Sequence, residues 1–169
     1  MRLLTELELN SLEDLFIIQI EQLYDAELRI FKALHDMVDA ATTPSLKQTF
    51  QAHLDQTRHH VERLKQIFQQ LGRSPEGETC KAMKGLRTEG KEVLSAKAVP
   101  EVRDAALIAT AQREEHYEIA GYDTARTFAH QLGYTDAACL LQSTLDEEKS
   151  TIDKLTEMAE SQVNLRTLP

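Results

Sequence analysis

The spacing of the breaks between helical segments constrains this chain more than any other feature. Four long segments carry apolar residues at helical spacing, and they cover approximately residues 11–41, 44–71, 100–133 and 135–162. Two connections between them are short, at Thr42-Thr43 and Gly133-Tyr134, whereas the middle connection runs from Gly72 to Val99. Because short connections force neighbouring helices to be antiparallel, the sequence predicts two helical hairpins joined by one long crossover.

The crossover itself contains a helical signal. It is rich in glycine, yet Cys80, Met83 and Leu86 recur at helical spacing, which predicts a short additional helix. Only 6 glycines and 4 prolines occur, and aromatic residues make up 5% of the chain, which disfavours a strand-rich fold. The predicted fold class is therefore all-α: one ferritin-like four-helix-bundle domain over residues 1–169, with one long crossover carrying a short fifth helix.

Local signals mark the ends of the predicted helices. Ser11-x-x-Asp14 resembles a capping box at the first helix, and Thr43-Pro44 offers an N-cap and a first-turn proline to the second. Gly72 is expected at the C′ position of the second helix. Thr135 is expected to cap the fourth.

Charge and composition exclude several function classes. The chain has 19 Lys and Arg against 28 Asp and Glu, a formal net charge of −9, which disfavours nucleic acid and anionic membranes as partners. No apolar stretch reaches about 18 residues, so no membrane span is expected. Met1–Asn10 is too short and acidic for a signal peptide. The two cysteines, Cys80 and Cys139, form no C-x-x-C motif, so we expect a reduced, cytoplasmic protein.

Each apolar stripe becomes polar near the middle of its helix. The polar positions are Glu27 in the first helix, His53, Thr57 and His60 in the second, Glu115 and Glu118 in the third, and Glu148 in the fourth. Burying several carboxylates without cations is costly. Bundles that project Glu and His inward from facing helices are how di-iron and di-manganese carboxylate sites are built. The pattern therefore predicts one or two iron or manganese ions in the core.

Simpler interpretations compete with this prediction. A single Glu in core register is more often partly exposed or paired with Lys, and a single core His is more often a hydrogen-bonded histidine than a ligand. His116 is a reserve ligand candidate. Three further residues are interpreted as ordinary helix surface: His59, Glu114 and Glu147.

Five short blocks carry a family resemblance over nearly the whole chain. They are Tyr24-Asp25-Ala26-Glu27, His53-Leu54-Asp55-Gln56-Thr57, Val102-Arg103-Asp104-Ala105-Ala106-Leu107-Ile108, Glu115-His116-Tyr117-Glu118-Ile119-Ala120 and Leu145-Asp146-Glu147-Glu148-Lys149. The chain resembles the YciF/YciE family of bacterial stress-response proteins in the ferritin-like superfamily. The resemblance implies a five-helix protomer that is similar to rubrerythrin and associates as a dimer.

The resemblance also implies a ligand set. Rubrerythrin-like sites use Glu on the first helix, Glu-x-x-His on the second, Glu-x-x-Glu on the third and Glu-x-x-His on the fourth. Carried over by position, with His60 in place of the exact second-helix spacing, the implied metal ligands are Glu27, Gln56, His60, Glu115, Glu118 and Glu148. Gln56 stands where Glu is expected and Thr151 where His is expected. A neutral amide is a poor iron ligand, so a one-metal or vestigial site stays open.

Two function hypotheses follow. The first is a di-iron-like protein that handles iron, oxygen or peroxide, and the second is a non-enzymatic dimeric stress or scaffold protein with a vestigial or absent metal site. A DNA-protecting role is disfavoured by the acidic charge, and no G-x-S-x-G or G-x-x-x-x-G-K motif occurs. A homodimer is expected to use the segment from Cys80 to Leu94, because its apolar residues exceed what a short surface helix can hide. These residues are Met83, Leu86, Val93 and Leu94.

Overall fold

Helices account for most of the residues that the computed structural model describes, 9–168. Residues 1–8, which include most of the segment judged not to be a signal peptide, lie outside them. The elements are α1 (Leu12–Ala40), α2 (Pro44–Gln70), α3 (Lys81–Ser95), α4 (Pro100–Gln131), α5 (Thr135–Met158), a π-helical turn (Ala159–Val163) and a 3₁₀ turn (Asn164–Thr167). The prediction of an all-α fold is confirmed, since the described residues contain no strand.

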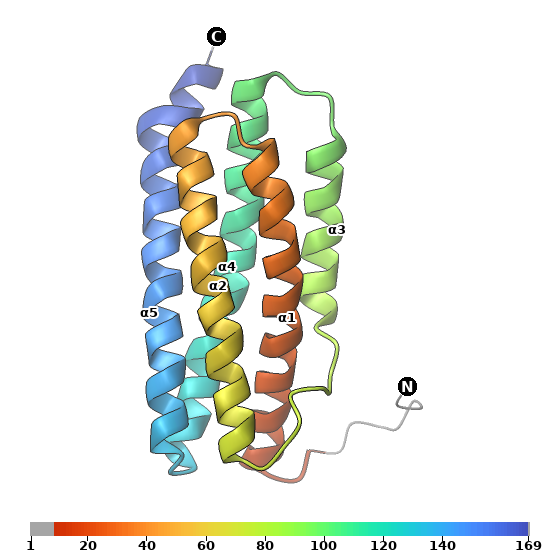
Figure 1. Cartoon of the computed structure of the whole chain (residues 1–169), viewed down its shortest axis with the longest axis vertical. Helices are drawn as coiled ribbons and strands as arrows, with labels where there is room; N and C mark the ends of the chain where they lie inside the picture. The colour runs from red at the N-terminus through yellow and green to blue at the C-terminus, as the bar shows by residue number, and fades with distance from the viewer. Residues whose placement is uncertain (1–8, 169) are drawn as a thin grey trace.

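The helices form two antiparallel hairpins joined by the crossover (Figure 1). Helices α1 and α2 make one hairpin, α4 and α5 make the other, and the crossover between them carries α3. Helix α3 packs along α1 and α4 on the outside of the four-helix bundle (Figure 1). This is the ferritin-like arrangement that the unequal connections predict.

Most predicted helix ends are found, with two differences. The Ser11 hydroxyl accepts a hydrogen bond from Asp14 N at 3.1 Å, and Gly72 and Gly133 adopt the left-handed conformation with φ of 64° and 78°. Thr135 is the first residue of α5 rather than its cap, and Thr43 makes no side-chain cap bond.

Asp104 of α4 binds the turn that precedes α2. Its carboxylate accepts hydrogen bonds from Thr42 N at 2.8 Å, Thr42 Oγ1 at 2.8 Å and Thr43 N at 2.7 Å. Burial raises the pKa of Asp104, but these hydrogen bonds outweigh it and leave the pKa below its usual value. One buried carboxylate thus ties the α1–α2 turn to the second hairpin.

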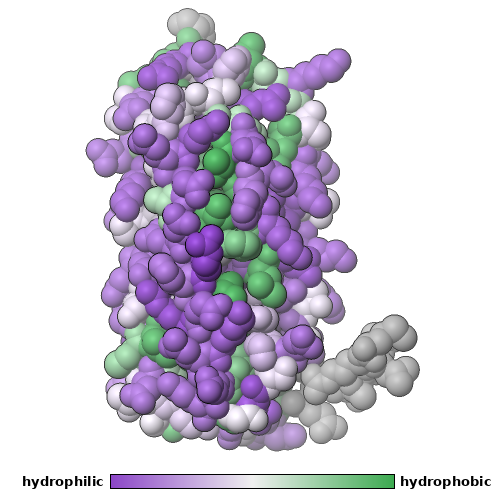
Figure 2. Space-filling model, in the orientation of Figure 1, coloured by the Kyte–Doolittle hydropathy of each residue, from purple (hydrophilic) through white to green (hydrophobic). Residues whose placement is uncertain are grey.

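The apolar core is divided into two clusters along the bundle. One surrounds Phe16 and Phe68, and the other surrounds Met37 and Phe50. Between them lies a layer of buried polar side chains at the middle of the four long helices. The face of the bundle seen in Figure 2 is mainly hydrophilic, with an interrupted line of apolar side chains. Apolar packing therefore closes the polar layer from both ends of the bundle.

The reasoning behind the predicted dimer surface is not supported by the packing of α3. Met83 is fully buried, and Leu86, Val93 and Leu94 are half-buried within the protomer. Leu86 and Leu94 pack against the core, so α3 hides more apolar surface than the sequence indicated. The homodimer stays a prediction.

None of the described helices is long and apolar enough to cross a membrane.

Substituting Asp104→Asn tests the contact of Asp104 with this turn. We expect the free energy of unfolding at pH 7 to fall by about 1–3 kcal/mol, because buried donors lose a charged acceptor. The folded-state pKa is depressed, so this contribution is present above the usual value of 3.8 and is lost as the pH falls through the folded value. Urea denaturation across pH, with the exposed Asp153→Asn as control, checks both points. An equal loss at all pH values would contradict the charge-based account.

Candidate metal centre

Six buried side chains that can bind metal form the middle layer of the bundle. They are Glu27 from α1, His53 and His60 from α2, Glu115 and Glu118 from α4, and Glu148 from α5. Each is at most 3% exposed. Their spacing explains the convergence: residues three or seven apart on a helix share a face, so α2 and α4 each direct two side chains inward.

The six residues fall into two overlapping groups. Ligand atoms of His53, Glu115, Glu118 and Glu148 lie within 4.8 Å of one another, and so do those of Glu27, His60 and Glu148. Glu148 belongs to both groups. Each group could hold a metal ion, and the two groups share one carboxylate.

Close contacts within the layer lack hydrogen-bond geometry. His53 Nε2 lies 2.8 Å from Glu115 Oε1, and His60 Nδ1 lies 2.9 Å from Glu148 Oε1. Most side-chain nitrogen and oxygen atoms of the six residues have no hydrogen-bond partner. They are Glu27 Oε2, both ring nitrogens of His53, His60 Nδ1, Glu115 Oε2, and both carboxylate oxygens of Glu118 and Glu148. Two atoms bound at right angles to one ion, each at about 2.1 Å, would lie about 3 Å apart. The donor set and its spacing therefore fit divalent cations.

Two neighbouring carboxylates, by contrast, each have an arginine. Arg87 of α3 donates to Glu114 at 2.9 Å, and Arg63 of α2 donates to both oxygens of Glu147 at 2.8 Å. The interpretation of Glu114 and Glu147 as ordinary helix surface was wrong, because Glu114 is buried and Glu147 is half-buried. Both lie within short runs of polar residues, where nothing in the sequence pattern marks them as buried or paired.

Electrostatics in the layer follow from burial and crowding. Burial and the neighbouring carboxylates raise the pKa values of Glu115 and Glu118 well above their usual range. Burial lowers the pKa of His53. It also opposes the charged form of His60, but Glu27 and Glu148 outweigh it and raise the pKa of His60 well above its usual value. Without cations, protons must neutralise part of the layer.

Tyr122 closes the layer on one side. It is fully buried, its hydroxyl donates a hydrogen bond to Glu27 Oε1, and its ring lies edge-on to His60 with centroids 6.3 Å apart. Tyr122 is therefore a core residue whose hydroxyl is hydrogen-bonded. This contact fixes the orientation of the Glu27 carboxylate.

The structure brings together five of the six expected ligands. The sixth, Gln56, lies elsewhere. Gln56 is half-buried and lines a surface hollow between α2 and α5 with Thr151, outside the buried layer. His53 occupies the layer instead, although it was not among the implied ligands. The sequence does contain a signal for His53, because His53 and His60 are seven residues apart on one apolar stripe and therefore face the same side of α2. His59 and His116 are exposed.

Comparison with known proteins assigns the family. The family described as "Domain of unknown function (DUF892)" matches residues 11–168. The chain belongs to the DUF892 family. Within it, the Escherichia coli (strain K12) protein YciF is 43% identical over 159 residues, which are 94% of this chain and 96% of that protein. The resemblance stated from the sequence is confirmed.

Solved structures agree with this DUF892 assignment. The crystal structure of the E. coli stress protein YciF superposes with a TM-score of 0.88 at 44% identity, covering 92% of this chain and 99% of the other. YcfI from Rhodopseudomonas palustris gives 0.85 at 39% identity, covering 92% and 98%. A Xanthomonas campestris protein gives 0.72 at 16% identity, covering 89% and 92%, and shows the fold alone.

The Arg87–Glu114 pair of this DUF892 chain provides a stability test. Arg87→Met leaves a buried carboxylate unpaired, so we expect the free energy of unfolding to fall by about 3–5 kcal/mol. The double variant Arg87→Met/Glu114→Leu should recover most of the loss, because two apolar side chains replace the pair. Urea denaturation measures both, and the exposed Arg113→Met serves as control. A double variant as unstable as the single one would show that packing, not charge, is responsible.

Proposed function

We propose that this chain is a stress protein of the YciF type whose bundle core binds two divalent cations, iron or manganese. One observation carries the proposal: four fully buried carboxylates meet, and within residues 9–168 none of them pairs with a lysine or arginine, while the two carboxylates beside them are each paired with an arginine. Four carboxylates and two neutral imidazoles balance the charge of two divalent cations. Carboxylate oxygen and imidazole nitrogen are ligands that suit iron and manganese.

Each residue has a definite part in this proposal. His53, Glu115 and Glu118 would hold one ion, Glu27 and His60 the other, and Glu148 both. When bound, such a pair would supply redox chemistry toward oxygen or peroxide. Tyr122 holds Glu27 through its hydroxyl, and the apolar clusters at both ends exclude water from the layer.

A second candidate is a non-enzymatic structural protein with a proton-filled layer. Raised pKa values at Glu115 and Glu118 support it, because protons on these groups remove part of the repulsion. YcfI of R. palustris is described as a candidate structural protein, which agrees with this alternative. The two candidates differ in whether added metal binds and stabilises the fold.

Metal titration decides between them. Purified protein, dialysed against Mn(II), or against Fe(II) without oxygen, should retain two ions per chain by mass spectrometry of the metal. Ligand that binds only the folded state stabilises it by about 2.7 kcal/mol at a concentration 100 times the dissociation constant, so the melting temperature should rise.

A matched pair of variants controls for non-specific binding. Glu118→Gln should lose binding at the position it shares with His53 and so lower the metal content. Glu157→Gln removes the same charge from an exposed site on α5 and should leave it unchanged. A parent protein that retains no metal and melts at the same temperature with and without Mn(II) would reject metal binding and favour the structural role.

A further inference from the structure

We infer that Glu147, held by Arg63, is a positioning residue that turns the Nδ1 atom of His60 toward the cation position it shares with Glu27 and Glu148. The inference rests on the proposed function and assigns that position a supporting outer layer. It also distinguishes the two cation positions, because no carboxylate among the described residues is hydrogen-bonded to a ring nitrogen of His53.

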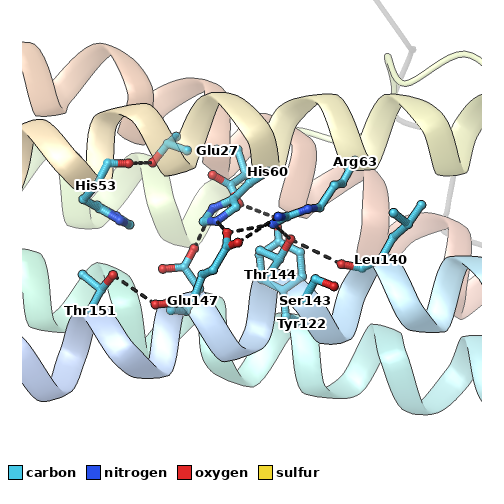
Figure 3. Close-up of polar contacts among 12 residues, drawn as sticks. Glu27, His53, His60, Arg63, Tyr122, Leu140, Ser143, Thr144, Glu147 and Thr151 are labelled. Carbon is cyan, nitrogen blue, oxygen red and sulfur yellow. Dashed lines mark hydrogen bonds and ion pairs between the residues drawn. The ribbon is translucent and has the colours of Figure 1, made fainter.

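The first step is the direction of the His60 ring. Its Nε2 lies 2.8 Å from Glu147 Oε2 in hydrogen-bond geometry, on the side away from the buried layer. Its Nδ1 lies 2.9 Å from Glu148 Oε1 and 3.3 Å from Glu27 Oε1, inside the layer. A neutral imidazole carries one N–H, so donating Nε2–H to Glu147 leaves the Nδ1 lone pair facing inward. Figure 3 shows His60 and Glu147 extending toward each other from α2 and α5.

The second step is the rigidity of Glu147. Arg63 donates Nη1 to Oε2 and Nη2 to Oε1, both at 2.8 Å, and the planar fork fixes the plane of the carboxylate (Figure 3). Arg63 Nη1 also donates to Thr144 Oγ1 at 3.2 Å, which anchors the guanidinium to α5. Arg63 and His60 are three residues apart on α2, so one helix face presents both to Glu147.

The third step is the contrast with His53. Neither ring nitrogen of His53 has a hydrogen-bond partner, and its close neighbour, Glu115, is itself a candidate ligand. A metal-bound His whose second nitrogen donates to a carboxylate is fixed in tautomer and orientation, and loss of that carboxylate typically costs 10–100-fold in metal affinity. Loss of Glu147 should therefore weaken one of the two cation positions and spare the other.

Glu147→Gln tests the inference, with Asp146→Asn as its matched control. Gln keeps the size of Glu147 but loses the charge and the symmetric pairing with Arg63, whereas Asp146 is exposed and its recorded side-chain contact is with Gln142 on its own helix. Anaerobic titration with Co(II), followed by calorimetry and by visible absorption, reports affinity and ligand geometry. We expect one Co(II) to bind 10–100-fold more weakly in Glu147→Gln and the other to bind as in the parent.

A spectroscopic measurement separates positioning from general stability. In Zn(II)-loaded protein with ¹⁵N-labelled histidine, the parent should show His60 protonated at Nε2 with Nδ1 bound to the ion. Arg63→Lys, which keeps the charge but loses the fork, should weaken the same Co(II) position by a smaller factor than Glu147→Gln. Thermal melts of each metal-free variant verify folding.

Each outcome has a distinct meaning. A parent that binds no Co(II), Zn(II) or Mn(II) rejects the proposed function and this inference together. A parent that binds two ions, with Glu147→Gln equal to Asp146→Asn, rejects the inference alone. Equal weakening of both ions, or Nδ1 protonated in the Zn(II)-loaded parent, also overturns it.

Discussion

The arrangement of this bundle depends on the repulsion among four carboxylates that are buried at its centre. Glu27, Glu115, Glu118 and Glu148 come from three different helices, and each is at most 1% exposed. An isolated buried carboxylate is so costly that it normally shifts its pKa or acquires a partner. The apolar core is accordingly interrupted at this level, with one cluster on either side.

The arginines show how the protein limits that repulsion. Arg87 and Arg63 each pair with a carboxylate that immediately precedes a central one in sequence, Glu114 and Glu147. The arginines thereby neutralise the charges of Glu114 and Glu147, which lie beside the central layer. The four central carboxylates remain next to one another. The crossover helix α3 acquires an electrostatic role here, since it supplies Arg87 to the buried pair. A buried pair adds little stability by itself. Its effect is to neutralise Glu114, whose charge acts on Glu115 and Glu118.

Sequence periodicity and connection lengths were sufficient for the fold and for most of the central layer. Glu27 and Glu148 interrupt clean apolar stripes, and each one's register fixed its direction. The ligand spacing of the family points to Gln56 on α2, whereas the apolar stripe of α2 marks His53 and His60. The structure follows the stripe, so His53 and not Gln56 lies in the central layer. Glu114 and Asp104 escaped prediction for another reason. Their partners, Arg87 and the turn at Thr42, are distant in sequence, so only tertiary packing reveals that these carboxylates are buried.

Cations and protons are two ways of neutralising the same four carboxylates, and they exclude one another. A cation requires ionised carboxylates and a free imidazole lone pair, whereas a metal-free layer needs protons on Glu115 and Glu118 to limit repulsion. Metal binding must therefore release protons. A metal-binding stress protein and a structural one need not differ in fold, because the same buried layer can exist in either state. What separates the two roles is the affinity of the layer for metal against its affinity for protons. Outer contacts such as His60–Glu147 act on that balance, because donation of Nε2–H keeps Nδ1 available to a cation.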